Sequence, residues 1–242
     1  MPRETETIRL NKFLSEIGFC SRRKADRLVQ EGRISVEGRL AVVGQKVSRR
    51  QKISCDGTII YTEKAEADRE IIWLVVNKPR GIVCTTSDND RAENIVEMIA
   101  YPSRVYPVGR LDKDSEGLIL MTNQGDLVNK ILKGQNAHEK EYEVKVNKPL
   151  TRDFLSGMAA GVELKELNQV TRPCKVSAAG EDSFRIILTQ GLNRQIRRMC
   201  EVFGYKVLQL KRVRIMNIRL GTLKPGKFRK MSEKEYQQMT AV

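Results

Sequence analysis

The sequence has few of the residues that usually build metal and redox sites. It contains one histidine, His138, and five cysteines, and no two cysteines form a C-x-x-C pair. A single histidine cannot form a two-histidine metal site, and an odd number of scattered cysteines argues against a zinc ribbon and against a disulfide framework. The sequence also has no glycine pattern of the Walker or Rossmann type. We therefore expect no metal and no nucleotide cofactor, and we interpret His138 as a surface loop residue.

Long apolar runs are also absent. The longest run near the middle of the chain, Ile71–Val76, is far shorter than a membrane span. The first residues, Met1–Glu6, lack the apolar core of a secretion signal. Together with the unpaired cysteines, these features predict a cytoplasmic protein with no membrane association.

Positive charge is what the chain has in excess. Among its 242 residues, 44 are Lys or Arg and 30 are Asp or Glu, which gives a formal net charge of +14. Such an excess favours an anionic partner, and without membrane features we expect that partner to be nucleic acid. The length allows one large domain or two smaller ones.

The first part of the chain, residues 1–62, has the pattern of a small basic α+β domain. Helical apolar spacing predicts helices at Ile8–Ile17 and Ser21–Glu31, and short strands joined by glycine turns follow them. A solvated helix face is the common explanation for any single lysine, but the density of charge here favours contacts with phosphates, each of which releases counterions. The candidate RNA-binding residues of this face are Arg9, Lys12, Arg22, Arg23, Lys24 and Arg27.

Residues 63–70 lack apolar periodicity, and we interpret them as a flexible linker. Residues 71–242 then contain many short predicted strands and few helices. The strands include Ile71–Val76, Lys140–Val146 and a separate pair at Lys206–Leu210 and Arg212–Leu220. This pattern predicts an α+β domain with a mixed, largely antiparallel sheet.

The stretch Val105–Thr122 is predicted to form a strand, a polar loop and a second strand. Chemistry often lies on a loop that rigid elements hold, so Arg110 and Asp112 are candidate site residues. We interpret the remaining polar and small residues of this stretch as ordinary turn residues. They are Asp114, Ser115 and Gly117.

A predicted helix at Arg194–Phe203 carries three arginines in its first turns, Arg194, Arg197 and Arg198. Cations at a helix N-terminus oppose the helix dipole, so we expect phosphates or a carboxylate nearby. Two further positions remain open in the sequence. Tyr142 is either a packing residue or a surface for base stacking, and Lys78 and Arg80 are either turn residues or phosphate contacts.

Several of these segments resemble a known family. Four segments of the first domain, Arg9–Leu14, Cys20–Asp26, Gly32–Val36 and Val42–Val47, resemble the S4 RNA-binding domain. Two later segments, Gly109–Gly117 and Arg194–Met199, resemble motifs of the pseudouridine synthases that modify ribosomal RNA. The stretch from Asn129 to Tyr142, together with Gln190–Asn193, looks closest to their RluF subgroup.

The resemblance implies isomerisation of uridine to pseudouridine without a cofactor, metal or energy source. It implies that Asp112 is the essential catalytic residue, that Arg197 pairs with it and that Arg110 fills the gap left by a flipped base. It also implies that Tyr142 stacks on the base and that Ile196 forms the apolar side of the pocket. Whether Asp112 attacks the sugar, attacks the base or removes a proton stays open.

The resemblance also implies a partner, a stem-loop of large-subunit (23S) ribosomal RNA, with a transfer RNA as a further candidate. We expect a monomer. The alternative from another class is an S4-type RNA-binding assembly or translation factor without catalysis. The combination of Arg110, Asp112, Tyr142 and Arg197 discriminates between the two, because a pure binding protein has no use for it.

Overall fold

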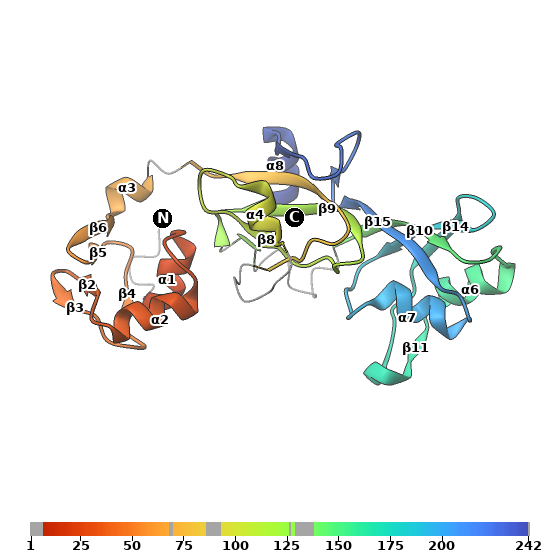
Figure 1. Ribbon diagram of the computed structural model, residues 1–242, viewed down its shortest axis with the longest axis horizontal. Coiled ribbons are helices and arrows are strands. Elements are labelled where there is room, and N and C mark those ends of the chain that lie inside the picture. The colour runs from red at the N-terminus through yellow and green to blue at the C-terminus, as the bar shows by residue number, and fades with distance from the viewer. Residues whose placement is uncertain (1–6, 68–69, 86–92, 126, 129–137, 242) are drawn as a thin grey trace. The chain divides into compact units, whose positions relative to one another are not determined.

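The computed structural model describes residues 7–67, 70–85, 93–125, 127–128 and 138–241. The chain divides into two compact units (Figure 1). The first consists of the residues up to Ile72, with Pro102–Val105 and Thr122–Val128, and the second comprises the remainder from Trp73 onward. Within the described ranges, no helix is long and apolar enough to cross a membrane.

The first unit contains the two predicted helices, each slightly shorter than its apolar pattern suggested. Helix α2 begins where predicted, because the Ser21 side chain accepts a hydrogen bond from the Lys24 N–H at 3.2 Å. The apolar faces of both helices, including Phe13 and Leu28, are buried in one core with the strand residues Ile34 and Ile53. Strands β3, β2, β5 and β6 form one sheet in that order, and β1 pairs with β4. The bounds are β1 Ile8–Arg9, α1 Leu10–Glu16, α2 Arg22–Gln30, β2 Ile34–Val36, β3 Arg39–Leu40, β4 Lys46–Val47, β5 Ile53–Cys55 and β6 Thr58–Tyr61.

The segment interpreted as a linker contains a short helix, α3 Glu63–Ala67. Its residues Glu, Lys and Ala are good helix formers, and the Thr62 Oγ1 accepts a hydrogen bond from the Ala65 N–H at 3.3 Å. The helix lacks an apolar face, so periodicity could not reveal it. Part of the predicted linker is thus helical, and the division into residues 1–62, 63–70 and 71–242 stays a prediction.

The second unit is built on a nine-stranded sheet with the order β13-β14-β10-β15-β9-β7-β17, with β16 and β8 attached to β15 and β9. Strands β10, β13, β14, β16 and β17 pair antiparallel with their neighbours, whereas β9 and β15 pair parallel. The sheet is therefore mixed and largely antiparallel, and the α+β fold class is confirmed. The strand bounds are β7 Trp73–Lys78, β8 Tyr106–Val108, β9 Glu116–Thr122, β10 Lys140–Val146, β13 Lys175–Ala178, β14 Ser183–Leu188, β15 Val207–Ile215, β16 Ile218–Arg219 and β17 Phe228–Lys230.

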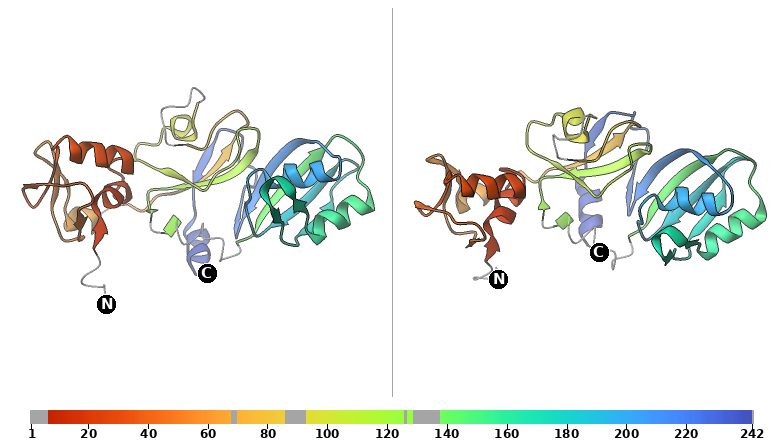
Figure 2. Two further views of the ribbon diagram at one scale, coloured as in Figure 1. Left: turned by 90° about the horizontal axis from the view of Figure 1, so that it is seen from below. Right: turned by 60° about the horizontal axis from the view of Figure 1, so that its bottom comes forward.

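Helices α6 and α7 cover one side of strands β10, β14 and β15 (Figure 2). Phe154 of α6 and Ile196 of α7 belong to the same buried cluster as Val144 and Phe184 of the sheet. The alternation predicted for Lys140–Val146 is confirmed, since Tyr142, Val144 and Val146 are all buried. The remaining elements are α4 Ile95–Ile99, α6 Arg152–Ala160, β11 Glu163–Leu164, the 3-10 turn Lys165–Leu167, β12 Gln169–Val170, α7 Gln195–Val202 and α8 Glu233–Thr240.

The two strands predicted at Lys206–Leu210 and Arg212–Leu220 are mainly one continuous strand, β15. The predicted strands left only Lys211 between them. In the structure Arg212 is only 4% exposed and lies within the sheet, so the strand continues through it.

Candidate active site

The polar loop between β8 and β9 holds the candidate residues of the central stretch. Arg110 is exposed, Asp112 is half-buried, and Leu111 between them is buried. Leu111 belongs to the same hydrophobic cluster as Tyr142 of β10 and Ile196 of α7. The structure therefore places the residue next to Asp112 in the cluster that contains two of the residues selected from the sequence.

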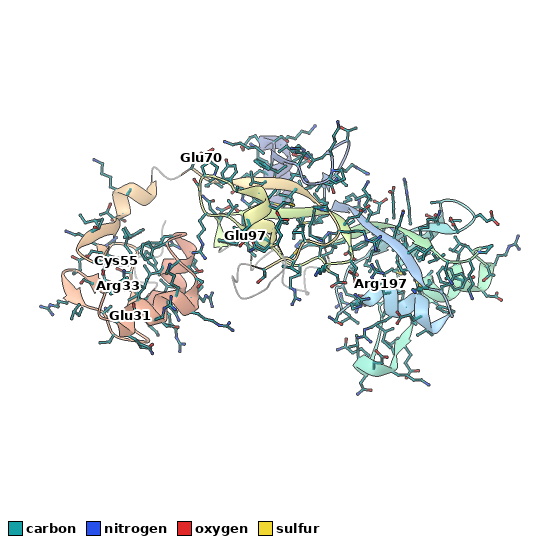
Figure 3. All side chains as sticks on the ribbon, in the orientation of Figure 1. Glu31, Arg33, Cys55, Glu70, Glu97 and Arg197 are labelled. Carbon is teal, nitrogen blue, oxygen red and sulfur yellow. The ribbon has the colours of Figure 1, made fainter. Side chains whose placement is uncertain are left out.

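The predicted ion pair between Asp112 and Arg197 is not formed. Arg197, labelled in Figure 3, is 8% exposed and lies on α7. Its Nη2 donates to the Asp114 carbonyl at 3.0 Å and its Nη1 donates to the Val207 carbonyl at 3.2 Å. Among the residues that the structure describes, no ion pair within 4.0 Å joins its guanidinium to Asp112.

The charge of Asp112 nevertheless reaches this guanidinium. Burial lowers the pKa of Arg197, the neighbouring Arg194 lowers it further, and the carboxylates of Asp114 and Asp112 act in the opposite sense. Arg197 thus holds the backbone of the loop, and the Asp112 carboxylate is close enough to oppose the lowering of the pKa of Arg197.

Lys78 is not a phosphate contact, which corrects one of the sequence-based candidates. It ends β7 with its side chain fully buried, at 0% exposure. Its Nζ donates to the carbonyls of Ile82 at 2.8 Å, Pro79 at 2.9 Å and Lys113 at 3.5 Å. Burial lowers the pKa of Lys78, and Asp112 is among the groups that oppose this shift. Arg80, by contrast, is exposed, and its Nη1 donates to the Leu208 carbonyl at 3.4 Å.

One of the three residues interpreted as ordinary turn residues has another role. Gly117 is the second residue of β9 and has φ +106°. A Cβ on it would lie 2.3 Å from the carbonyl oxygen of Arg212, so only glycine allows β9 and β15 to approach this closely. Asp114 lies in a turn, as predicted. Ser115 is fully buried, and its N–H closes this turn by donating to the Asp112 carbonyl at 3.0 Å.

The anions expected near the first turns of α7 are carboxylates of the chain itself. The Nη1 of Arg194 lies 3.7 Å from the Oδ2 of Asp114. Arg198 forms an ion pair with Glu166. Arg198 also donates from its Nε to the Asn193 carbonyl at 3.1 Å. Contacts of Arg194 and Arg198 with RNA stay a prediction.

The basic face of the first unit lies on α2. Arg22, Arg23, Lys24 and Arg27 are all exposed, and Arg27 is 3.8 Å from Glu31 in an i,i+4 pair. On the other helix, Lys12 pairs with Glu16 at 3.3 Å, and the exposed Arg9 immediately precedes α1.

One residue next to the loop was missed by sequence reasoning. Arg212 of β15 is the register partner of Tyr142 on β10, and its guanidinium is buried. Its Nε donates to the Leu118 carbonyl at 2.6 Å, and its Nη1 donates to the Arg110 carbonyl at 3.4 Å. The available signal was an arginine between the apolar residues Leu210 and Val213, within a run of strand-forming residues.

A hollow of about 590 Å³ lies away from this loop, lined by residues from Arg219 to Lys227 together with Arg229 and Glu235. None of the candidate catalytic residues lines it. Within the described ranges, no group of three or more His, Cys, Asp or Glu side chains is placed to hold a metal ion.

Comparison with known families agrees with this arrangement. The family model described as RNA pseudouridylate synthase matches residues 72–202, which is more than half of the chain, and the S4 domain model matches residues 8–53. The chain belongs to the RNA pseudouridylate synthase family. This pseudouridine synthase therefore isomerises uridine in RNA, and the non-catalytic alternative is not favoured.

Named relatives of this pseudouridine synthase cover most of its length. The dual-specificity RNA pseudouridine synthase RluF of Escherichia coli (strain K12) is 49% identical over 229 residues, which are 95% of this chain and 77% of the relative. The ribosomal large subunit pseudouridine synthase B of Bacillus subtilis (strain 168) is 31% identical over 242 residues, covering 97% and 96% of the two chains. A crystal structure of a pseudouridylate synthase superimposes with a TM-score of 0.70 at 25% identity, covering 96% of this chain and 99% of that one.

Proposed function

We propose that this enzyme isomerises a uridine in a stem-loop of large-subunit ribosomal RNA, with Asp112 as the catalytic carboxylate. The observation that carries the proposal is the place of Asp112. It is half-buried on a loop whose neighbouring residue Leu111 belongs to the hydrophobic cluster that also contains Tyr142 and Ile196. The names of the relatives support the ribosomal substrate, and the name dual-specificity supports a transfer RNA as a second one.

The target base has to leave its stem before a carboxylate can reach the glycosidic bond. The deep groove of an A-form stem does not admit side chains, and flipping a base costs a few kcal/mol. Arg110 is exposed at the loop and is suited to fill the space that the base leaves, because its planar guanidinium can stack and bind phosphate together. Tyr142 and Ile196 then offer an apolar wall for the flipped uracil, and stacking on an aromatic ring is worth about 1–3 kcal/mol.

The second part of the proposal assigns RNA binding and catalysis to different parts of the chain. Residues 1–62 bind RNA through the basic face of α2, and residues 71–242 carry the chemistry. The S4 match and the exposure of Arg22, Arg23, Lys24 and Arg27 support this division. The enzyme works as a monomer in the cytoplasm.

The test is the substitution Asp112→Asn, which keeps the size of the side chain and removes its charge. We expect the rate of pseudouridine formation in large-subunit ribosomal RNA to fall about 10³-fold or more, since general acid–base or nucleophilic roles are worth factors of this order. Asp114→Asn is the matched control, because Asp114 lies in the same loop but its side chain is exposed and faces Arg194. We expect that variant to stay within about tenfold of the wild type, a margin for its weak contact with Arg194.

A folded Asp112→Asn variant with undiminished activity would contradict the catalytic assignment. The substrate is tested separately by mapping pseudouridines in ribosomal and transfer RNA from cells with and without the gene. Loss of pseudouridine from transfer RNA alone would contradict the ribosomal substrate and leave the catalytic residue untouched.

A further inference from the structure

Arg212 is a buried cation that has no carboxylate partner among the described residues. It lies in the middle of the sheet at 4% exposure, and within the described part of the chain no ion pair joins it to an acidic side chain. Its guanidinium binds backbone oxygens instead, through Nε to Leu118 and through Nη1 to Arg110. Because the charge is not neutralised, its presence requires an explanation.

Stability does not supply that explanation. The Nη2 of Arg212 is buried and has no hydrogen-bond partner in the described structure. A buried donor without an acceptor costs about 1–3 kcal/mol, and replacing a buried charge by a well-packed apolar side chain is often neutral or stabilising. The position is therefore better explained by geometry than by folding energy.

The geometry concerns the loop that carries Asp112. The two carbonyls bound by Arg212 belong to Arg110, just before Asp112, and to Leu118, just after the loop has entered β9. The backbones of β9 and β15 are also pressed together here, since Gly117 is the parallel register partner of Arg212. Arg212 thus connects the start of the loop to the strand that follows it through hydrogen bonds to both.

Two other buried cations bind the part of the same loop that follows Asp112 in the chain. Lys78 donates to the Lys113 carbonyl, which also accepts the Gly81 N–H at 2.8 Å, and Arg197 donates to the Asp114 carbonyl. The loop backbone is therefore held on both sides of Asp112. Of these anchors, only Arg212 binds both the start of the Arg110–Asp112 segment and the strand that follows it.

We propose that Arg212 is a positioning residue for uridine isomerisation, which fixes the backbone of the Arg110–Asp112 segment in the conformation that presents the Asp112 carboxylate. The proposal rests on the proposed catalytic role of Asp112. Arg212 is buried and does not contact RNA, so it acts on the rate of the chemical step and not on RNA affinity. A displacement of about 1 Å in a catalytic group can cost about 10²-fold in rate.

The experiment compares Arg212→Met with Arg214→Met in the full-length protein. Arg214 is the matched control, because it lies on the same strand and is also largely buried but binds the carboxylates of Glu139 and Glu141 at 2.9 and 2.8 Å. For Arg212→Met we expect the single-turnover rate at saturating RNA to fall about 30- to 100-fold, with the dissociation constant for RNA within about twofold of the wild type. For Arg214→Met we expect lower thermal stability and a rate within about threefold.

Hydrogen exchange provides a readout that does not depend on activity. Amides of residues 109–116 should exchange faster in Arg212→Met than in the wild type, and they should keep the wild-type rate in Arg214→Met. Arg212→Lys should fall between Arg212→Met and the wild type in both measurements, because an ammonium donates to carbonyls but lacks the planar fork. This variant also serves as the test if Arg212→Met does not fold.

The proposal is overturned if a folded Arg212→Met keeps the wild-type rate and the wild-type exchange of the loop. It is equally overturned if Arg214→Met loses as much rate, or if the loss lies in RNA affinity. For Arg212→Lys, an unchanged rate with unchanged exchange has the same consequence. Asp112→Asn separates the two ideas, since an active Asp112→Asn removes the catalytic assignment itself, whereas an inactive one beside a fully active Arg212→Met removes only the role of Arg212.

Discussion

At the scale of single residues, the buried cations around Asp112 bind carbonyl oxygens, and among the described residues none of them forms an ion pair with a carboxylate. These cations are Lys78, Arg197 and Arg212. A carbonyl oxygen satisfies a hydrogen-bond donor without pairing it with a carboxylate. These three cations therefore hold the backbone of the loop that carries Asp112.

The substitution Gly117→Ala is predicted to lower both stability and activity. In Gly117→Ala the new Cβ would meet the Arg212 carbonyl oxygen at 2.3 Å, and the residue would also keep its unfavourable φ of +106°. We expect the free energy of unfolding to fall by about 2–5 kcal/mol and activity to fall with the displaced loop. Chemical denaturation and the isomerisation assay measure the two effects.

Gly221→Ala is the control for this substitution. Gly221 also has a positive φ, of +59°, but no atom lies within 4 Å of the position that the new methyl carbon would take. We expect a cost of about 1–2 kcal/mol from the backbone conformation alone, with activity retained. Equal effects of the two substitutions would show that the close approach of β9 and β15 is unimportant.

Two substitutions of Tyr142 distinguish a role in base stacking from a role in proton transfer. If its ring supports the flipped uracil, Tyr142→Phe should keep the rate within about threefold, whereas Tyr142→Ala should lose the equivalent of one stacking interaction, about 1–3 kcal/mol or 5- to 150-fold. Both variants are assayed at a temperature where melting curves show them folded, since Tyr142 also packs in the main cluster. An equally large loss in both would assign the role to the hydroxyl group.

At the scale of elements, the C-terminal helix α8 depends on an ion pair at its start. Glu235 closes a capping box with Ser232 and receives both Nη groups of Arg229 at 2.7 Å. Hydrogen bonds from Arg229 are the main reason why the pKa of Glu235 is lowered to about 2. A carboxyl with a lowered pKa stabilises the fold above its ordinary value near pH 4.5, and this contribution is lost as the pH falls toward 2.

Glu235→Gln should therefore lower the free energy of unfolding by roughly 1–3 kcal/mol at pH 7, and the difference from the wild type should shrink to near zero by about pH 2. Denaturant titrations at a series of pH values measure it. Glu233→Gln is the control, because Glu233 is exposed on the same helix and bonds only Gln237 at 2.8 Å among the hydrogen bonds of the described side chains. A pH-independent difference for Glu235→Gln would contradict this account of the pair.

Helix starts and half-buried strands were predictable because their signals are local. Ser21, Thr151 and Ser232 each accept the capping hydrogen bond at the start of a helix. Strand β10 shows the alternation of a sheet with one buried face over Lys140–Val146. A cap or an alternating pattern involves residues within a few positions of each other, so the sequence displays it directly.

The supports of the candidate site were not predictable in the same way. The sequence does not distinguish a buried lysine or arginine from an exposed one. Lys78 and Arg212 are buried because strands that are distant in the sequence surround them. The tight approach at Gly117 depends on a parallel pairing between β9 and β15, which lie far apart in the chain. The motif pointed to Arg197, but the fold decided that its guanidinium binds the Asp114 carbonyl and not Asp112.

At the scale of the whole molecule, part of the excess positive charge lies on one helix of the first unit. Arg22, Arg23, Lys24 and Arg27 are exposed together on α2, and Arg27 alone of the four has an ion-pair partner in the described structure. Phosphates that bind this face release counterions, so log K for RNA falls with log salt in proportion to the number of phosphates bound. The slope of that dependence therefore measures how many phosphates the helix neutralises.

Changing all four residues to Gln should weaken RNA binding and reduce the salt slope by about 0.7–0.9 for each phosphate that is no longer neutralised, or roughly 3 in all. Filter binding or fluorescence anisotropy from low to moderate salt measures the slope, and the melting curve verifies that the S4 core around Phe13 and Leu28 is intact. The control changes Lys145, Lys175 and Arg185 to Gln, because these exposed residues of the second unit already pair with Asp182, Glu139 and Glu143. A full salt slope in the α2 variant, or an equal reduction in the control, would mean that the second unit binds the phosphates and that α2 is a solvated surface.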